Sequence, residues 1–121
     1  VAKVIFSPAA AEDIEQILAW SISTFGLNAQ RRYRTLIERA IRDVSEDWLL
    51  PGSMARPEIV KNARTYRLRS SRDRVNVRAE RVRHPRHLLL YRKVADGVIE
   101  IGRVLHDSVD LKKNIPSSYR P

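Results

Sequence analysis

The stretch HLLLYRKVADGVIEIGRVL, residues 87–105, holds two apolar runs on either side of Asp96-Gly97. An Asp-Gly pair between apolar runs is a strong signal for a two-residue β-hairpin turn. The stretch therefore predicts two antiparallel strands over residues 88–94 and 98–105. In RTYRLRS, residues 64–70, apolar Tyr66 and Leu68 alternate with polar neighbours, which predicts a third strand over residues 66–68 beside this hairpin.

The apolar period changes from two to three-and-four on the N-terminal side of residue 64. AKVIFS, residues 2–7, predicts a short first strand, and Ser7-Pro8 is typical of an N-cap followed by proline at the first helical position. Gly26 should end the first helix, Asn28 should open a second, and Pro51-Gly52 should follow its end. The predicted apolar faces are Ile14, Ile17, Leu18, Ser21 or Ile22, and Phe25 in the first helix, and Ala29, Tyr33, Leu36, Ile37, Ala40, Val44 and Trp48 in the second.

Together these elements predict an α+β fold in which a helical hairpin over residues 8–48 packs on one face of an antiparallel sheet. We expect residues 1–121 to form a single domain, because a chain of this length supports one core. The absence of cysteine excludes disulfide scaffolds, zinc ribbons and thiol catalysis. No apolar run approaches the length of a membrane span, and no charged-then-apolar signal segment opens the sequence, so we expect a cytoplasmic protein.

The net charge of +9 is concentrated in one part of the chain. Residues 56–92 carry twelve Lys and Arg against three Asp and Glu, and the remainder is almost neutral. Such a cationic stretch favours a polyanion or an acidic protein partner, although charged strands also protect a sheet edge from aggregation. Within it, residues 70–86 are too polar for a core, so we expect an extended arm or a mobile loop.

The segment that follows the last strand allows a metal site, an acid–base pair or a helix start. His106 and Asp107 are neighbours and point to opposite faces of a strand, so they cannot share one ion. His84 and His87 have no carboxylate beside them. We therefore expect no metal and no cofactor. Asp107 as an N-cap with Asp110 three residues later predicts a short helix over residues 108–114.

Two interpretations of Arg103 and His106 remain open, one structural and one functional. Arg103 interrupts an apolar strand and, if buried, needs a carboxylate such as Glu100 or Asp110. Alternatively, Arg103 could hold a phosphate while His106 donates a proton. Single residues of these types at strand ends are more often structural, which favours the first interpretation.

Several of these motifs resemble ParE toxins of the RelE/ParE superfamily, from bacterial type II toxin–antitoxin systems. The resemblance rests on residues 7–26, SPAAAEDIEQILAWSISTFG, on YRLRS, and on residues 86–115, RHLLLYRKVADGVIEIGRVLHDSVDLKKNI. Its most specific part is the run from Arg103 to Asp107, followed by Asp110-Leu111. It implies a non-catalytic toxin that poisons DNA gyrase, a type II topoisomerase, and is neutralised by a ParD-like antitoxin. The long basic connection over residues 70–86 departs from the tighter turn of many ParE-like chains.

Two other classes compete with this interpretation. A RelE-like, metal-free endoribonuclease that cuts mRNA in the ribosome would recruit its catalytic groups from Arg67, Arg69, Arg103, His106 and Tyr119. We expect Tyr119, beyond Pro116, to lie in a mobile tail, which leaves no fixed acid–base pair. A plain nucleic-acid-binding module, although direct binding of nucleic acid is possible, lacks stacking aromatics, since residues 56–90 contain only Tyr66.

The non-enzymatic toxin predicts two interaction surfaces. An acidic, amphipathic antitoxin segment should lie beside the helical hairpin and set its carboxylates against Arg64, Arg67 or Arg69. The gyrase contact should include Arg103, His106, Lys112 and Lys113. Deletion from Ser108 onward should then remove toxicity and leave the fold intact.

Overall fold

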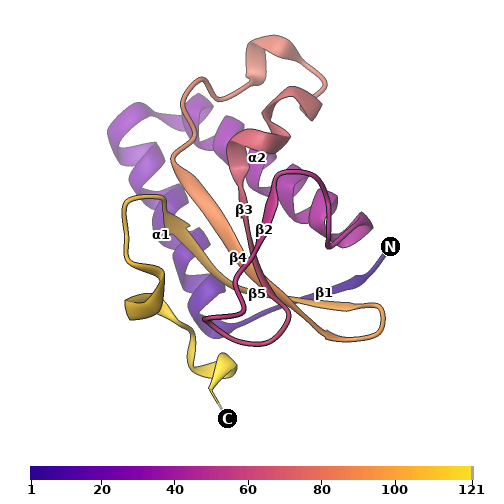
Figure 1. The fold of residues 1–121 in the computed structure, drawn as a ribbon. Helices are drawn as coiled ribbons and strands as arrows, with labels where there is room; N and C mark the ends of the chain where they lie inside the picture. Colours follow the sequence, from indigo (N-terminus) through magenta and orange to yellow (C-terminus); the bar gives the residue numbers. More distant parts are fainter. Residues whose placement is uncertain (121) are drawn as a thin grey trace.

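The computed structural model describes residues 1–120 and has an α+β architecture in which a helical pair covers one face of a mixed sheet (Figure 1). The sheet has five strands in the order β1-β5-β4-β3-β2. The elements are β1 (Lys3–Phe6), α1 (Pro8–Phe25), α2 (Leu27–Glu46), β2 (Ser53–Ala55), β3 (Ala63–Arg67), β4 (His87–Ala95) and β5 (Val98–His106). The predicted fold class is confirmed.

The predicted hairpin around Asp96-Gly97 is confirmed, and both of its strands lie inside the sheet. Strands β4 and β5 pair antiparallel from His87 opposite His106 to the turn, where Gly97 takes a positive φ of 69°. β3 pairs antiparallel with β4, but it ends at Arg67, so the predicted strand residue Leu68 instead begins a 3₁₀ segment. Apolar side chains of all three strands meet the helices in one buried core.

The two outer strands turn the predicted antiparallel sheet into a mixed one. β1 pairs in parallel with β5 through Lys3–Phe6, whereas β2 pairs antiparallel with β3. β2 was not predicted, because its three residues are too few to show an alternating pattern.

The start of α1 is fixed to the sheet by its N-cap. The Ser7 hydroxyl oxygen accepts a hydrogen bond from the Ala10 N–H at 3.0 Å and donates to the Gly102 carbonyl at 2.6 Å. One side chain thus satisfies a free helix N–H and joins α1 to β5.

The helical hairpin is confirmed, with three corrections. Gly26, at φ +93°, joins the helices directly, so α2 begins at Leu27 rather than at Asn28. α2 ends at Glu46, and Trp48 therefore lies beyond it. At the far end of α1, Ile22 and Phe25 are exposed instead of joining the core, because the hairpin extends past the edge of the sheet there.

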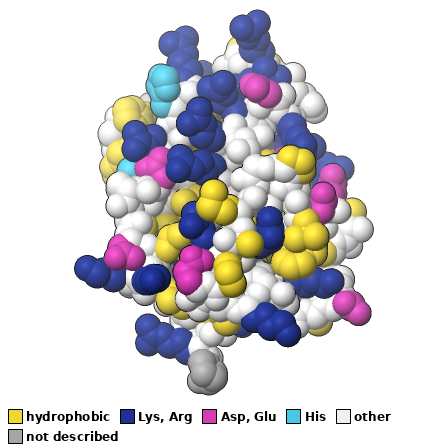
Figure 2. Space-filling model, in the orientation of Figure 1, with side chains coloured by type: hydrophobic (Ala, Val, Ile, Leu, Met, Phe, Trp, Pro, Cys, Tyr) yellow, Lys and Arg dark blue, Asp and Glu magenta, His cyan; other side chains and the backbone are white. Residues whose placement is uncertain are grey.

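The structure corrects the predicted extended arm over residues 70–86. The chain here forms 3₁₀ segments, Leu68–Arg74 and Arg78–Glu80, and Figure 2 shows Lys and Arg side chains crowded at this end of the molecule. The segment is fastened to α2 because the Ser71 hydroxyl donates to the buried Asp43 carboxylate at 2.5 Å. Arg39 and Arg74 approach the other oxygen of that carboxylate at 3.1 Å, as ion contacts whose angles fall outside hydrogen-bond geometry.

The prediction of a mobile tail around Tyr119 is also wrong. The Tyr119 side chain is 4% exposed and packs with Ala63 and Leu90 on the face of the sheet opposite the helices. It lies so close to Gly102 that a Cβ atom there would come within 2.5 Å of the Tyr119 ring. The Arg92 guanidinium covers the ring, with its carbon 4.4 Å from the ring centroid.

The predicted helix over residues 108–114 is reduced to a 3₁₀ turn, Leu111–Asn114. Asp110 caps this turn by accepting from the Lys112 N–H at 2.9 Å, whereas Asp107 takes no part in the cap. The turn and Tyr119 together hold the C-terminal segment against the sheet. The expectation that deletion from Ser108 onward leaves the fold intact is therefore corrected, because that deletion removes the buried Tyr119.

None of the helices in residues 1–120 is both long and apolar enough to span a membrane. The same residues contain no group of three or more His, Asp or Glu side chains placed to hold a metal ion.

Candidate functional site

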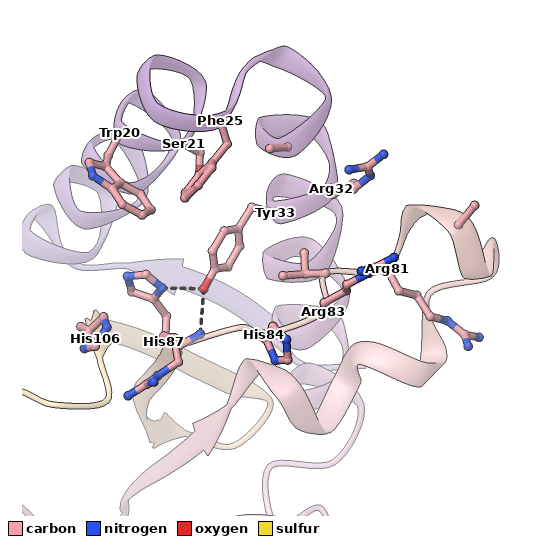
Figure 3. A pocket seen from close by; sticks show the side chains of 14 residues that line it. Trp20, Ser21, Phe25, Arg32, Tyr33, Arg81, Arg83, His84, His87 and His106 are labelled. Atoms are coloured by element: carbon pink, nitrogen blue, oxygen red, sulfur yellow. Dashed lines mark hydrogen bonds between the residues drawn. The ribbon is translucent and has the colours of Figure 1, made fainter.

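A cleft of about 680 Å³ lies between the joined end of the helices and the ends of β4 and β5 (Figure 3). Its upper wall is aromatic: Trp20 and Phe25 come from the last turns of α1, and Tyr33 comes from α2. The Trp20 and Phe25 rings meet edge to face, with centroids 5.4 Å apart. Trp20 is 53% exposed and Phe25 is 66% exposed, so the cleft offers two large aromatic surfaces to solvent.

Tyr33, itself part of this wall, forms a polar pair with the partly buried His87. The Tyr33 oxygen lies 2.5 Å from His87 Nδ1 and accepts from the Arg86 N–H at 3.3 Å. Burial raises the pKa of Tyr33 to about 12 and lowers the pKa of His87 to about 4. Both groups are therefore neutral at pH 7, the Tyr33 hydroxyl donates to Nδ1, and the His87 proton resides on Nε2.

His106 completes this part of the cleft. Its ring meets the His87 ring edge to face, with centroids 5.5 Å apart, because the two residues are directly paired across β4 and β5. The Ser108 N–H donates to His106 Nδ1 at 3.1 Å. His106 is the last residue of β5, as the sequence indicated, but it also lines the cleft, which the local sequence did not indicate.

The remaining border of the cleft is cationic. Arg32, Arg81, Arg83 and Arg86 line it, and no Asp or Glu of the described residues does. Arg86 is held by Asp107 in a two-pronged contact of 3.0 and 3.1 Å, which lowers the pKa of the Asp107 carboxyl. Arg81 donates to backbone carbonyls of residues 73 and 75.

Arg103 has a different partner from those the sequence suggested. Its Nε and Nη2 atoms each donate to the Asp13 carboxylate at 2.8 Å, so neither Glu100 nor Asp110 is the partner. Asp13 also accepts from the Val104 N–H at 2.9 Å. β1 ends opposite Ile101, so Asp13 occupies the edge of β5 that β1 leaves uncovered.

The predicted gyrase-binding residues divide between surface and interior. Lys112 and Lys113 are exposed on the 3₁₀ turn, and His106 is partly exposed. Arg103 keeps only 22% of its side chain exposed because of its ion pair, and its Nη1 also donates to the Asn114 carbonyl. Arg103 therefore holds the turn that carries the two lysines.

The predicted antitoxin-binding arginines do not share one surface. Along β3, Arg64 has the same orientation as Tyr66 on the helix side, whereas Arg67 has that of Ala63 on the opposite side. Arg64 is partly buried and donates to the Ser53 hydroxyl. Arg67 and Arg69 remain exposed.

The groups considered for ribonuclease chemistry do not form one site. His106 faces the aromatic cleft, while Tyr119 is buried on the opposite face of the sheet. Arg67 leaves β3 on that opposite face, but its Nη1 lies 4.0 Å from the Asp107 carboxylate, which also lies 3.5 Å from His106 Nδ1. Burial raises the pKa of Tyr119, whose hydroxyl is directed at the Leu90 carbonyl. Arg103 is engaged by Asp13, and Arg69 lies in the 3₁₀ segment after β3.

A helical hairpin on a five-stranded sheet, with an arginine-rich segment at one end, defines a small single-sheet α+β protein. The family model described as "ParE toxin of type II toxin-antitoxin system, parDE" matches residues 4–111. The chain therefore belongs to the ParE toxin family and is the toxin component of a type II toxin–antitoxin system. A search of curated proteins finds no match.

Sequence reasoning missed the cleft because its residues come from four separated segments. The available signals were weak: Trp20 lies off the predicted apolar face of α1, and Phe25 directly precedes the helix-ending Gly26. Neither pattern predicts that the basic residues 81–86 fold back beside them.

Proposed function

We propose that this toxin acts by inhibiting DNA gyrase and that a ParD-like antitoxin neutralises it. The observation that carries the proposal is the family match over residues 4–111, which includes the run from Arg103 to Leu111 where the resemblance to ParE toxins is most specific. In this proposal the toxin traps its target by binding and performs no catalytic step.

The separation of the candidate ribonuclease groups supports a binding mechanism. General acid–base cleavage of RNA needs its groups within hydrogen-bond reach of one substrate. Here His106 and Tyr119 lie on opposite faces of the sheet, and Tyr119 is buried. A target-binding toxin needs only a fixed, accessible surface.

The surface proposed for gyrase is the end of β5 together with the 3₁₀ turn Leu111–Asn114. Lys112 and Lys113 supply exposed positive charge, and His106 is the last residue of β5. Arg103 is a positioning residue, because its bonds to Asp13 and Asn114 hold the turn to the body of the domain.

For the antitoxin, the exposure of Arg67 and Arg69 supports part of the predicted surface. An acidic segment would meet the exposed Arg67 and Arg69, whereas Arg64, held by Ser53, would contribute less. Reversing the charge of Arg67 and Arg69 should slow association, because exposed charges act chiefly on the rate of encounter. Unchanged association at low salt after this reversal would exclude these arginines from the antitoxin surface.

The gyrase proposal is tested with supercoiling inhibition by purified toxin variants. Lys112→Glu combined with Lys113→Glu should weaken inhibition strongly, since two exposed cations of the contact are reversed. Lys61→Glu is the matched control, as Lys61 is an exposed lysine of the loop before β3. Equal inhibition by both variants would remove the 3₁₀ turn from the proposed contact.

A further inference from the structure

We propose that the cleft lined by Trp20, Tyr33, Arg83 and His87 is a binding site for a nucleoside phosphate, either free or within single-stranded nucleic acid. The base would stack on the aromatic wall, and the phosphate would meet the arginines of the border. This site shares His106 with the gyrase contact proposed above, but it does not depend on that contact.

The fold removes the objection that the sequence raised against nucleic-acid binding. Residues 56–90 contain only one aromatic residue, which argued against base stacking. The helices, however, bring Trp20, Phe25 and Tyr33 against the basic residues 81–86 (Figure 3). Cations interleaved with exposed aromatic rings, the combination that binds bases and phosphates, therefore exist in space although not along the chain.

The arginines of the border are not all engaged within the protein. Asp107 occupies Arg86, and backbone carbonyls occupy Arg81. Within residues 1–120, the guanidinium groups of Arg32 and Arg83 have neither an ion pair nor a hydrogen bond. With no carboxylate in the cleft lining, these two cations favour an anionic ligand, and guanidinium matches phosphate with paired hydrogen bonds.

His87 adds a donor of fixed direction. Its Nδ1 is taken by the Tyr33 hydroxyl, and its Nε2–H has no hydrogen-bond partner among residues 1–120 while remaining accessible. A neutral imidazole N–H inside an aromatic cleft suits the acceptor atoms on the edge of a base or a phosphate oxygen.

The lining also distinguishes this ligand from an acidic amphipathic peptide. A helical peptide docks its apolar face into a continuous hydrophobic groove. Among residues 1–120, the only aliphatic residues of the cleft are Ala29, Ala79 and Val82, and the large apolar surfaces are aromatic rings. Flat rings beside free guanidinium groups favour stacking of a base over packing of leucine-like side chains.

The test is isothermal titration calorimetry of the full chain. The probes are adenosine monophosphate and a short single-stranded oligodeoxyadenylate. Two matched probes separate the contributions: adenosine lacks the phosphate, and inorganic pyrophosphate lacks the base. Arg32→Gln with Arg83→Gln should weaken nucleotide binding about tenfold or more, because two phosphate contacts are lost. Arg31→Gln, an exposed arginine one residue away and outside the lining, should change affinity less than about twofold.

Trp20→Ala separates the two parts of the site. It should weaken adenosine monophosphate about tenfold and leave pyrophosphate binding unchanged, since stacking acts on the base alone. If adenosine monophosphate and the oligonucleotide bind with equal affinity, the ligand of the cleft is a free nucleotide. If the oligonucleotide binds more tightly, the ligand is single-stranded nucleic acid. The proposal is overturned if no nucleotide probe binds, if the Arg32/Arg83 variant binds as the wild type does, or if only an acidic peptide binds.

Discussion

Replacing Asp13 by alanine should destabilise the fold by about 3 kcal/mol, although Asp13 lies on a helix whose neighbours are largely exposed. The carboxylate accepts two hydrogen bonds from Arg103 and one from the Val104 N–H, all between 2.8 and 2.9 Å. Its removal leaves the Val104 N–H unsatisfied near the core, which costs about 1–3 kcal/mol. The remaining loss of stability comes from the unpaired Arg103 guanidinium. This contribution is reduced because 22% of the Arg103 side chain is exposed to water.

The assay is urea unfolding, with the midpoint and the slope both recorded. Glu12→Ala is the matched control: Glu12 is exposed on the preceding position of the same helix and should cost less than about 0.5 kcal/mol. Adding Arg103→Met to Asp13→Ala should cost less than the sum of the single changes, because the two side chains act as one unit. A loss below about 1 kcal/mol for Asp13→Ala would refute the reasoning.

Three further outcomes are expected. Asp43→Ala should lower the free energy of unfolding by about 2–4 kcal/mol, because it removes the partner of Ser71, Arg39 and Arg74. It should also expose residues 70–86 to limited proteolysis, and cleavage confined to the termini would contradict this. Gly102→Ala should displace the Tyr119 ring and cost about 1–3 kcal/mol in thermal or urea unfolding, whereas the same change in a Tyr119→Ala background should cost little. Between pH 7 and pH 5 the wild type should lose about 2 kcal/mol more stability than His87→Gln, since the pKa of His87 is lowered from 6.5 in the unfolded chain to about 4 in the fold. The unfolded state binds that proton first, so stability is present above about pH 6.5 and falls as the pH drops toward 4; parallel pH profiles would contradict the assignment.

The elements carried by local pattern were predictable from the sequence. The Asp96-Gly97 turn between apolar runs led to β4 and β5, and Ser7-Pro8 led to the start of α1. Each of these signals acts over a few residues, where turn geometry and capping chemistry determine the backbone.

The elements carried by distant polar contacts were not predictable. Nothing near Asp43 indicates that a carboxylate inside α2 anchors a segment 28 residues further along the chain. Likewise, the tail looked mobile because Tyr119 follows Pro116, while its partner Gly102 lies in the middle of a strand. The ion pair of Asp13 with Arg103 spans 90 positions, so no spacing rule could have selected it over Glu100 or Asp110.

The most direct test of the proposed mechanism applies one preparation of the full chain to two assays: supercoiling by purified DNA gyrase, with and without the cognate antitoxin, and cleavage of ribosome-bound mRNA. A gyrase-binding toxin predicts inhibition of supercoiling that the antitoxin reverses, together with intact mRNA. Cleaved mRNA with unchanged supercoiling would contradict it and would assign the protein to the endoribonuclease class.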